Sequence, residues 1–133
     1  MAKIIIVDDD FNVANSYKSK LISEGYEVEI VGDVDALSAI RAMKPDLVLL
    51  DIFMPNISGL LILRELRADS ELASVSVLIL TNDAKASDMD SAVKLGVDGY
   101  ILKAETDSDA LVGRVRAILE EKKDESLPSE GVI

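Results

Sequence analysis

A chain of 133 residues, 49% of them hydrophobic, is long enough for one domain with a substantial core. Because only 4% of the residues are aromatic, this core must consist mainly of aliphatic side chains. The chain contains no Cys and no His, which excludes disulfides, zinc–thiolate sites, thiol catalysis and histidine as a general base or metal ligand. Its net charge of −11 argues against a broad basic face for nucleic acid or anionic membrane.

Apolar runs of strand length alternate along the chain with amphipathic runs of helix length. Residues 4–7 are continuous and β-branched, which is typical of a strand buried on both faces. Residues 11–24 follow with apolar side chains at helical spacing. In chain order we expect strand 4–7, helix 11–24, strand 26–31, helix 34–43, strand 47–50, helix 59–68, strand 75–80, helix 84–95, strand 97–102 and a helix from about 106 to 123.

Glycines, a proline and polar capping residues support several of these boundaries. Gly25 and Gly96 stand where a glycine commonly ends a helix, and Pro45 follows the second expected helix. Asp33 and Ser58 are each expected to cap the helix that begins after them.

The alternation predicts an α/β fold. Because each parallel crossover needs a helix and is right-handed, five successive βα units favour a five-stranded, doubly wound parallel sheet of order 2-1-3-4-5, the flavodoxin-like (βα)5 arrangement.

The domain is expected to cover residues 1–123. Residues 124–133 are polar and are expected to form a tail or linker, which leaves open whether the chain stands alone or is a piece of a larger protein. We see no signal peptide and no apolar stretch of membrane-spanning length, so the expected location is the cytoplasm.

Polar residues stand where the expected strands end. Asp8 and Asp9 follow the first strand, Asp51 the third, Thr81 the fourth and Lys103 the fifth. In the 2-1-3-4-5 order the ligand crevice lies between the first and third strands, so the three aspartates are expected to converge there. Crowded carboxylates repel one another unless a cation sits among them, and oxygen ligands suit Mg²⁺, with Mn²⁺ as the alternative.

This set of residues suits phosphoryl transfer. An aspartate beside a bound cation can act as a nucleophile and form an aspartyl phosphate. Lys103 would help to neutralise the transferring group, and the Thr81 hydroxyl can donate a hydrogen bond to it. Each residue also has an ordinary interpretation: Asp9 or Asp10 can cap the first helix, and Lys103 alone would be a solvated lysine. That such ordinary interpretations hold at all four strand ends together is much less probable than that any single one of them holds.

Five segments carry a resemblance to a known family. Together they resemble the receiver domains of two-component response regulators, the chemotaxis receivers included, and the similarity extends over about residues 3–123. The segments are residues 5–10, residues 45–55 with Gly59, residues 80–81, residues 92–96 and residues 99–103.

The resemblance implies a set of roles around one phosphorylated residue. Asp51 would be the phosphoacceptor and a metal ligand. Asp9 and the backbone carbonyl of Phe53 would bind Mg²⁺ directly, with Asp8 acting through water, and Lys103 would contact the phosphoryl group.

The resemblance also implies a switch and partners. The Thr81 hydroxyl would move towards the phosphate and the Tyr100 ring would turn inward, although periodicity alone favours an ordinary half-buried strand aromatic at 100.

The phosphoryl group would come from a sensor histidine kinase or a histidine phosphotransfer protein. A downstream protein would bind the face of the fourth helix, fifth strand and fifth helix, without direct contact to nucleic acid or membrane. Dimerisation of the phosphorylated chain is left open. The domain would catalyse its own phosphorylation and dephosphorylation but would not be an enzyme in the usual sense.

The sequence departs from the family pattern at three positions. Ala104 stands where the family usually has a proline, often in cis, and a cis bond before a non-proline residue costs about 3 kcal/mol. Asn82 replaces a smaller residue, and Phe53 places a ring where it influences attacking water. We therefore expect slow hydrolysis of the aspartyl phosphate.

Three other functions compete with this interpretation. A flavodoxin-like electron carrier would need a phosphate-binding loop after the first strand, where three aspartates stand instead. A phosphatase of the haloacid dehalogenase type shares the chemistry but places its nucleophile after the first strand. A degenerate receiver that serves only as a docking module is kept open by Asn82 and Ala104.

Overall fold

Five parallel strands form one sheet in the order β2-β1-β3-β4-β5 in the computed structural model, which describes residues 2–82, 86–103 and 106–125. This confirms the predicted fold and strand order. The strands are β1 (Lys3–Val7), β2 (Glu27–Val31), β3 (Leu47–Asp51), β4 (Ser76–Thr81) and β5 (Gly99–Leu102). The helices are α1 (Phe11–Ser23), α2 (Ala36–Met43), α3 (Gly59–Ala68), α4 (Ala86–Lys94) and α5 (Ser108–Glu125).

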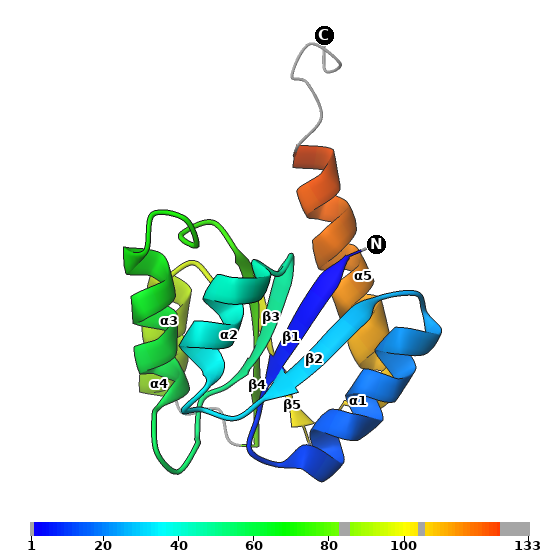
Figure 1. Cartoon of the computed structure of the whole chain (residues 1–133), viewed down its shortest axis with the longest axis horizontal. Helices are drawn as coiled ribbons and strands as arrows, with labels where there is room; N and C mark the ends of the chain where they lie inside the picture. The colour runs from blue at the N-terminus through cyan, green and yellow to red at the C-terminus, as the bar shows by residue number, and fades with distance from the viewer. Residues whose placement is uncertain (1, 83–85, 104–105, 126–133) are drawn as a thin grey trace, which may run out of the picture.

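Helices cover both faces of the sheet, which explains the continuous apolar strands. Figure 1 shows α1 and α5 on one face and α2, α3 and α4 on the other. Side chains of β1 alternate between the two cores: Ile4 and Ile6 pack with α1 and α5, whereas Ile5 and Val7 pack with the other three helices. The carboxyl ends of the strands lie together at the lower edge of the sheet in Figure 1.

Most expected helix ends are confirmed. Asp10 caps α1 by accepting a hydrogen bond from the Val13 amide, and Ser58 caps α3 through its side chain. Gly25 and Gly96 both adopt positive φ (97° and 74°), which glycine reaches without strain. The strands β4 and β5 begin one and two residues later than expected, and α5 continues to Glu125. The expected start of the fourth helix, at 84, lies outside the described residues.

The prediction that Asp33 caps the second helix is wrong. The helix α2 begins at Ala36, and its N-cap residue, Asp35, makes no capping hydrogen bond through its side chain. The Asp33 carboxylate instead accepts hydrogen bonds from the loop between β3 and α3, at Asn56 and Ile57. Donors far away in the sequence therefore occupy the carboxylate that the local pattern assigned to the helix.

No helix in the described parts of the chain combines the length and the apolar character needed to cross a membrane.

Candidate functional site

Three of the predicted site residues meet at the carboxyl edge of the sheet. Asp8 directly follows β1, Asp51 is the last residue of β3, and Lys103 follows β5. Because β1 and β3 are neighbours in register, with Val7 opposite Leu50, the two aspartates emerge side by side. The two carboxylates therefore lie between the first and third strands, where the strand order reverses and the ligand crevice is predicted.

The ammonium of Lys103 lies between the two carboxylates. Its Nζ is 2.6 Å from Asp8 Oδ2 and 3.2 Å from Asp51 Oδ2, the latter with hydrogen-bond geometry. All three side chains are buried, with exposed fractions of 5% for Lys103, 1% for Asp8 and 9% for Asp51. A cation and two anions are thus held together away from water, where their interactions are much stronger than at the surface.

Burial and charge move the pKa values of Asp51 and Lys103. Burial raises the pKa of the Asp51 carboxyl above its usual value; Lys103 opposes this shift and Asp8 reinforces it. Burial alone would lower the pKa of Lys103, but its contacts with Asp8 and Asp51 outweigh burial and raise the pKa. Lys103 therefore keeps its proton at neutral pH.

Asp9 lies apart from the Lys103 cluster. Its Oδ1 accepts a hydrogen bond from the backbone N–H of Asp33, at 3.2 Å. Its Oδ2 accepts no hydrogen bond from the described residues. The ordinary interpretation of this pair, a helix cap, applies to Asp10, whose Oδ1 accepts from the Val13 amide.

The remaining predicted residues surround the cluster at different depths. The Phe53 amide donates to Asp51 Oδ1 at 3.2 Å, while its ring is 47% exposed. Thr81 is fully buried at the end of β4, next to the Leu80 that pairs with Asp51. Asn82 is exposed, and Tyr100 is 48% exposed on β5. Ala104 lies outside the described residues.

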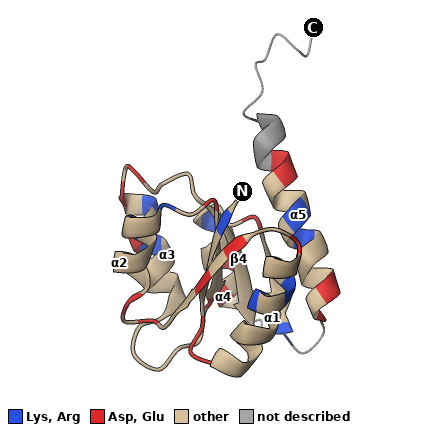
Figure 2. Ribbon diagram, turned by 45° about the vertical axis from the view of Figure 1, so that its right-hand side comes forward, with Lys and Arg blue, Asp and Glu red and all other residues tan. Residues whose placement is uncertain are grey.

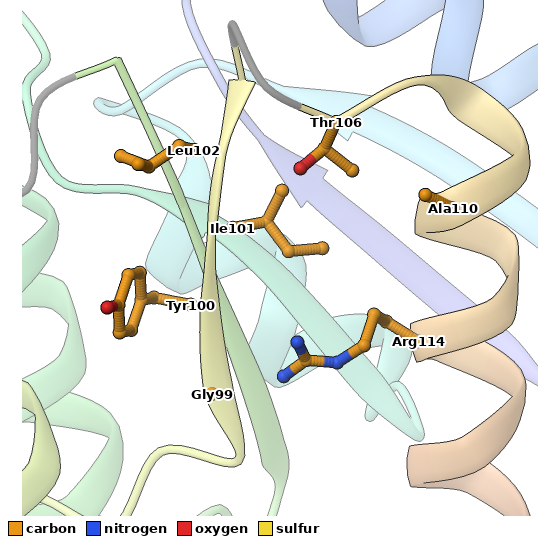
Figure 3. A pocket seen from close by; sticks show the side chains of 7 residues that line it. All are labelled: Gly99, Tyr100, Ile101, Leu102, Thr106, Ala110 and Arg114. Carbon is orange, nitrogen blue, oxygen red and sulfur yellow. The ribbon is translucent and has the colours of Figure 1, made fainter.

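An open pocket of about 650 Å³ lies along β5 and α5, away from the carboxylates. Figure 3 shows Tyr100 and Leu102 on one side of β5 and Ile101 on the side of α5, with Arg114 reaching from α5 towards Gly99. Asp8, Asp51 and Lys103 do not line this pocket.

The donor set fits a hard cation, although the present arrangement is centred on Lys103. No group of three potential ligands is arranged to hold a metal ion among the described residues. Asp8 Oδ2, however, is buried without a hydrogen bond and meets only the Lys103 ammonium, as an ion pair. Such an oxygen, with the Asp51 carboxylate at the same ammonium, is the type of ligand that Mg²⁺ prefers.

Two residues of the site were not found from the sequence. Gly32 has no room for a Cβ without crowding Asp9, since that atom would lie 3.3 Å from Asp9 Oδ1. The Asp33 carboxylate joins its loop to the one after β3. Nothing in a single sequence distinguishes these two residues from ordinary loop residues.

A family model for the response regulator receiver domain matches residues 4–116 of the chain. The DNA-binding response regulator MtrA of Mycobacterium tuberculosis is 39% identical over 124 residues, which cover 92% of this chain and 53% of that protein. The response regulator MprA of Mycobacterium avium is 35% identical over 124 residues, which again cover 92% of this chain and 53% of that protein. The chain thus spans about half the length of these relatives.

Solved structures support the same assignment. A CheY-like response regulator receiver domain protein from Methanospirillum hungatei JF-1 superposes with a TM-score of 0.87 at 28% identity, covering 95% of this chain and 99% of that one. A putative response regulator from Chloroflexus aurantiacus J-10-fl gives a TM-score of 0.81 at 29% identity, covering 90% and 98%. The strand order, the extent of the family match and these similarities together show that the chain belongs to the receiver domains of the response regulators of two-component signalling.

Proposed function

We propose that this receiver domain takes a phosphoryl group from a phosphohistidine of a sensor kinase or phosphotransfer protein onto Asp51. The observation that carries the proposal is the buried Lys103 ammonium between Asp8 and Asp51 at the carboxyl edge of the sheet. A buried cation beside a carboxylate suits a site that must receive further negative charge.

In the proposed transfer, an Asp51 oxygen attacks phosphorus, a P–O bond forms and the P–N bond to the donor histidine breaks. Lys103 neutralises charge on the incoming phosphoryl oxygens. This neutralisation needs little reorganisation, because the Lys103 ammonium already lies beside Asp51. The amide of Phe53, which bonds Asp51 Oδ1, orients the carboxylate. Asp8, Asp9, Asp51 and the Phe53 carbonyl are the proposed holders of Mg²⁺, which would neutralise phosphate charge when bound.

We assign the switch to Thr81 and Tyr100. Thr81 is buried at the end of β4, close to the Asp51 register position, and Tyr100 is half-exposed on β5. A hydroxyl drawn towards the phosphate would vacate space into which the Tyr100 ring can turn. The changed face of α4, β5 and α5 would then bind the output partner, or a second phosphorylated copy of the chain.

The distribution of charge on the surface bears on the kind of partner that the domain would bind. Figure 2 shows Lys and Arg scattered among acidic residues on the ribbon, in keeping with the net charge of −11. Protein partners suit such a surface better than nucleic acid, and a cytoplasmic location suits them as well. The MtrA relatives are nevertheless named DNA-binding, and this chain covers only about half of their length. DNA binding by a longer protein that contains this domain is therefore compatible with the proposal.

Phosphorylation at Asp51 is tested by incubating the chain with acetyl phosphate and Mg²⁺ and measuring its intact mass. We expect a gain of one phosphoryl group, lost in Asp51→Asn and retained in Asp10→Asn, because Asn also caps helices well. An unmodified wild type that also fails to bind beryllofluoride would instead support a docking module. Continuous turnover of small phosphate esters would support a phosphatase of the haloacid dehalogenase type.

We propose that the aspartyl phosphate decays slowly, with the Phe53 ring, two residues after Asp51, and Asn82, directly after Thr81, screening Asp51 from water. Phe53→Asn should speed the decay several-fold, measured as loss of the phosphorylated mass after acetyl phosphate is removed. Phe11→Asn is the matched control, since Phe11 is similarly exposed (53%) and stands at the start of α1. Rapid decay in the wild type, hardly changed by Phe53→Asn, would contradict this prediction.

A further inference from the structure

Asp33 is a buried acid to which the proposed transfer assigns no role. Its side chain is almost fully enclosed, with 3% of the residue exposed. Oδ2 accepts from the amides of Asn56 (2.7 Å) and Ile57 (2.9 Å), and Oδ1 from the Val34 amide (2.8 Å) and Asn56 Nδ2 (3.3 Å). Burial alone would raise the pKa of this carboxyl, but the four hydrogen bonds outweigh burial and lower the pKa.

The same residue contacts two parts of the candidate site. Its backbone N–H donates to Asp9 Oδ1, while its carboxylate holds the loop that begins after Asp51 and carries Phe53. The loop after β2 and the loop after β3 run together at the carboxyl edge of the sheet (Figure 1). Asp33 is thus the link between Asp9 and the loop that contains Phe53.

We propose that Asp33 is a positioning residue for the cation site, holding the Asp9 carboxylate with its N–H and the β3–α3 loop with its side chain. The inference rests on the proposed function, because it assumes that Asp9 and the Phe53 carbonyl bind Mg²⁺. With Oδ1 engaged by the Asp33 amide, Asp9 keeps Oδ2 for the cation. Groups that orient metal ligands in this way commonly change metal affinity about 10- to 100-fold when they are removed.

The packing of Gly32 supports this role. A Cβ at position 32 would come within 3.3 Å of Asp9 Oδ1, closer than most real contacts of that atom. A glycine at this position lets the Gly32–Asp33 peptide approach the Asp9 carboxylate closely. The Asp33 N–H therefore contacts Asp9 on one side of the site, and the Asp33 carboxylate contacts the β3–α3 loop on the other.

The test compares three variants of the whole chain with the wild type by calorimetric titration with Mg²⁺. Asp33→Asn keeps the size of the side chain but turns an amide donor towards other donors, and we expect about tenfold weaker Mg²⁺ binding. Asp35→Asn is the matched control, because it removes the same charge from an exposed side chain without a capping hydrogen bond, and its affinity should equal that of the wild type. Gly32→Ala crowds Asp9 without touching the Asp33 carboxylate and should also weaken binding.

A second measurement separates positioning from simple stability. Amide hydrogen exchange in the metal-free protein should be faster at Asn56 and Ile57 in Asp33→Asn, and unchanged there in Gly32→Ala. At saturating Mg²⁺, the phosphorylation rate of Asp33→Asn should return to near the wild-type rate, because the defect lies in cation binding.

The outcomes distinguish this inference from the proposed function. Equal Mg²⁺ affinities for Asp33→Asn and Asp35→Asn, with faster loop exchange in the former, would mean a structural role only and overturn the inference alone. A wild type that binds no Mg²⁺ would overturn the metal-dependent function, and the inference with it.

Discussion

Gly59→Ala is expected to lower the free energy of unfolding by at least about 3 kcal/mol, at the upper end for overpacked sites. A Cβ at this position would overlap the carbonyl oxygen of Asp51 and come within 2.8 Å of the Ile52 Cα. Both obstacles are backbone atoms, which cannot move aside as the end of a flexible side chain can. The Gly59 amide also bonds the Ile52 carbonyl at 2.9 Å, so α3 cannot shift without losing this contact.

The same substitution should impair the candidate site, because the atoms that must move belong to Asp51 and Ile52. We expect phosphorylation by acetyl phosphate to fall even at temperatures where the variant remains folded. The measurements are urea unfolding followed by circular dichroism and intact mass after incubation with acetyl phosphate.

Gly113→Ala is the matched control for Gly59→Ala. Gly113 lies within α5, and nothing stands within 4 Å of its would-be Cβ. Because alanine favours the helix over glycine, this variant should gain about 0.5–1 kcal/mol of stability. A Gly59→Ala protein as stable as the wild type would show that helix α3 does not approach β3 as closely as described.

The fold was predictable because its signals are local and repeated. The apolar runs at β1, β3 and β4 are continuous, since helices cover both faces of the sheet, and this pattern distinguishes strands from amphipathic helices. Strand order then followed from the right-handed crossovers. The convergence of Asp8, Asp51 and Lys103 could be predicted in outline, because the carboxyl ends of parallel strands share one edge.

The contacts that could not be predicted from the sequence depend on partners far along the chain. Asp33 had the local features of a helix cap, but its carboxylate bonds to amides 23 and 24 residues away. Arg67 is a similar case: its guanidinium donates to four backbone carbonyls, two in the segment after α3 and two in the residues directly after α4. Local propensity contains no information about such partners, so only the tertiary structure reveals them.

Lys103→Met is expected to lower the free energy of unfolding by about 3 kcal/mol at neutral pH without divalent cations. The variant leaves Asp8 and Asp51 buried and adjacent without the ammonium that now lies between them. Lys20→Met is the matched control, because Lys20 also pairs with an aspartate, Asp109, at 2.9 Å. The side chains of this pair are 38% and 78% exposed, so little change is expected.

The pH dependence of the Lys103→Met variant has a definite sign. Without Lys103, burial and the charge of Asp8 raise the pKa of the Asp51 carboxyl in the folded state further above its unfolded value. The folded state then binds more protons than the unfolded state, so the variant gains stability as the pH falls from 7 towards 5. Its deficit relative to the wild type should shrink over this range, as measured by urea unfolding at each pH.

Mg²⁺ should reduce the same deficit at constant pH. A cation that binds between the carboxylates restores the missing positive charge, and binding to the folded state alone stabilises it by mass action. The rise in melting temperature on adding millimolar Mg²⁺ should therefore be larger in Lys103→Met than in the wild type, whose own ammonium competes with the ion. An equal or smaller rise would contradict the proposal that Lys103 and the cation neutralise the same pair of carboxylates.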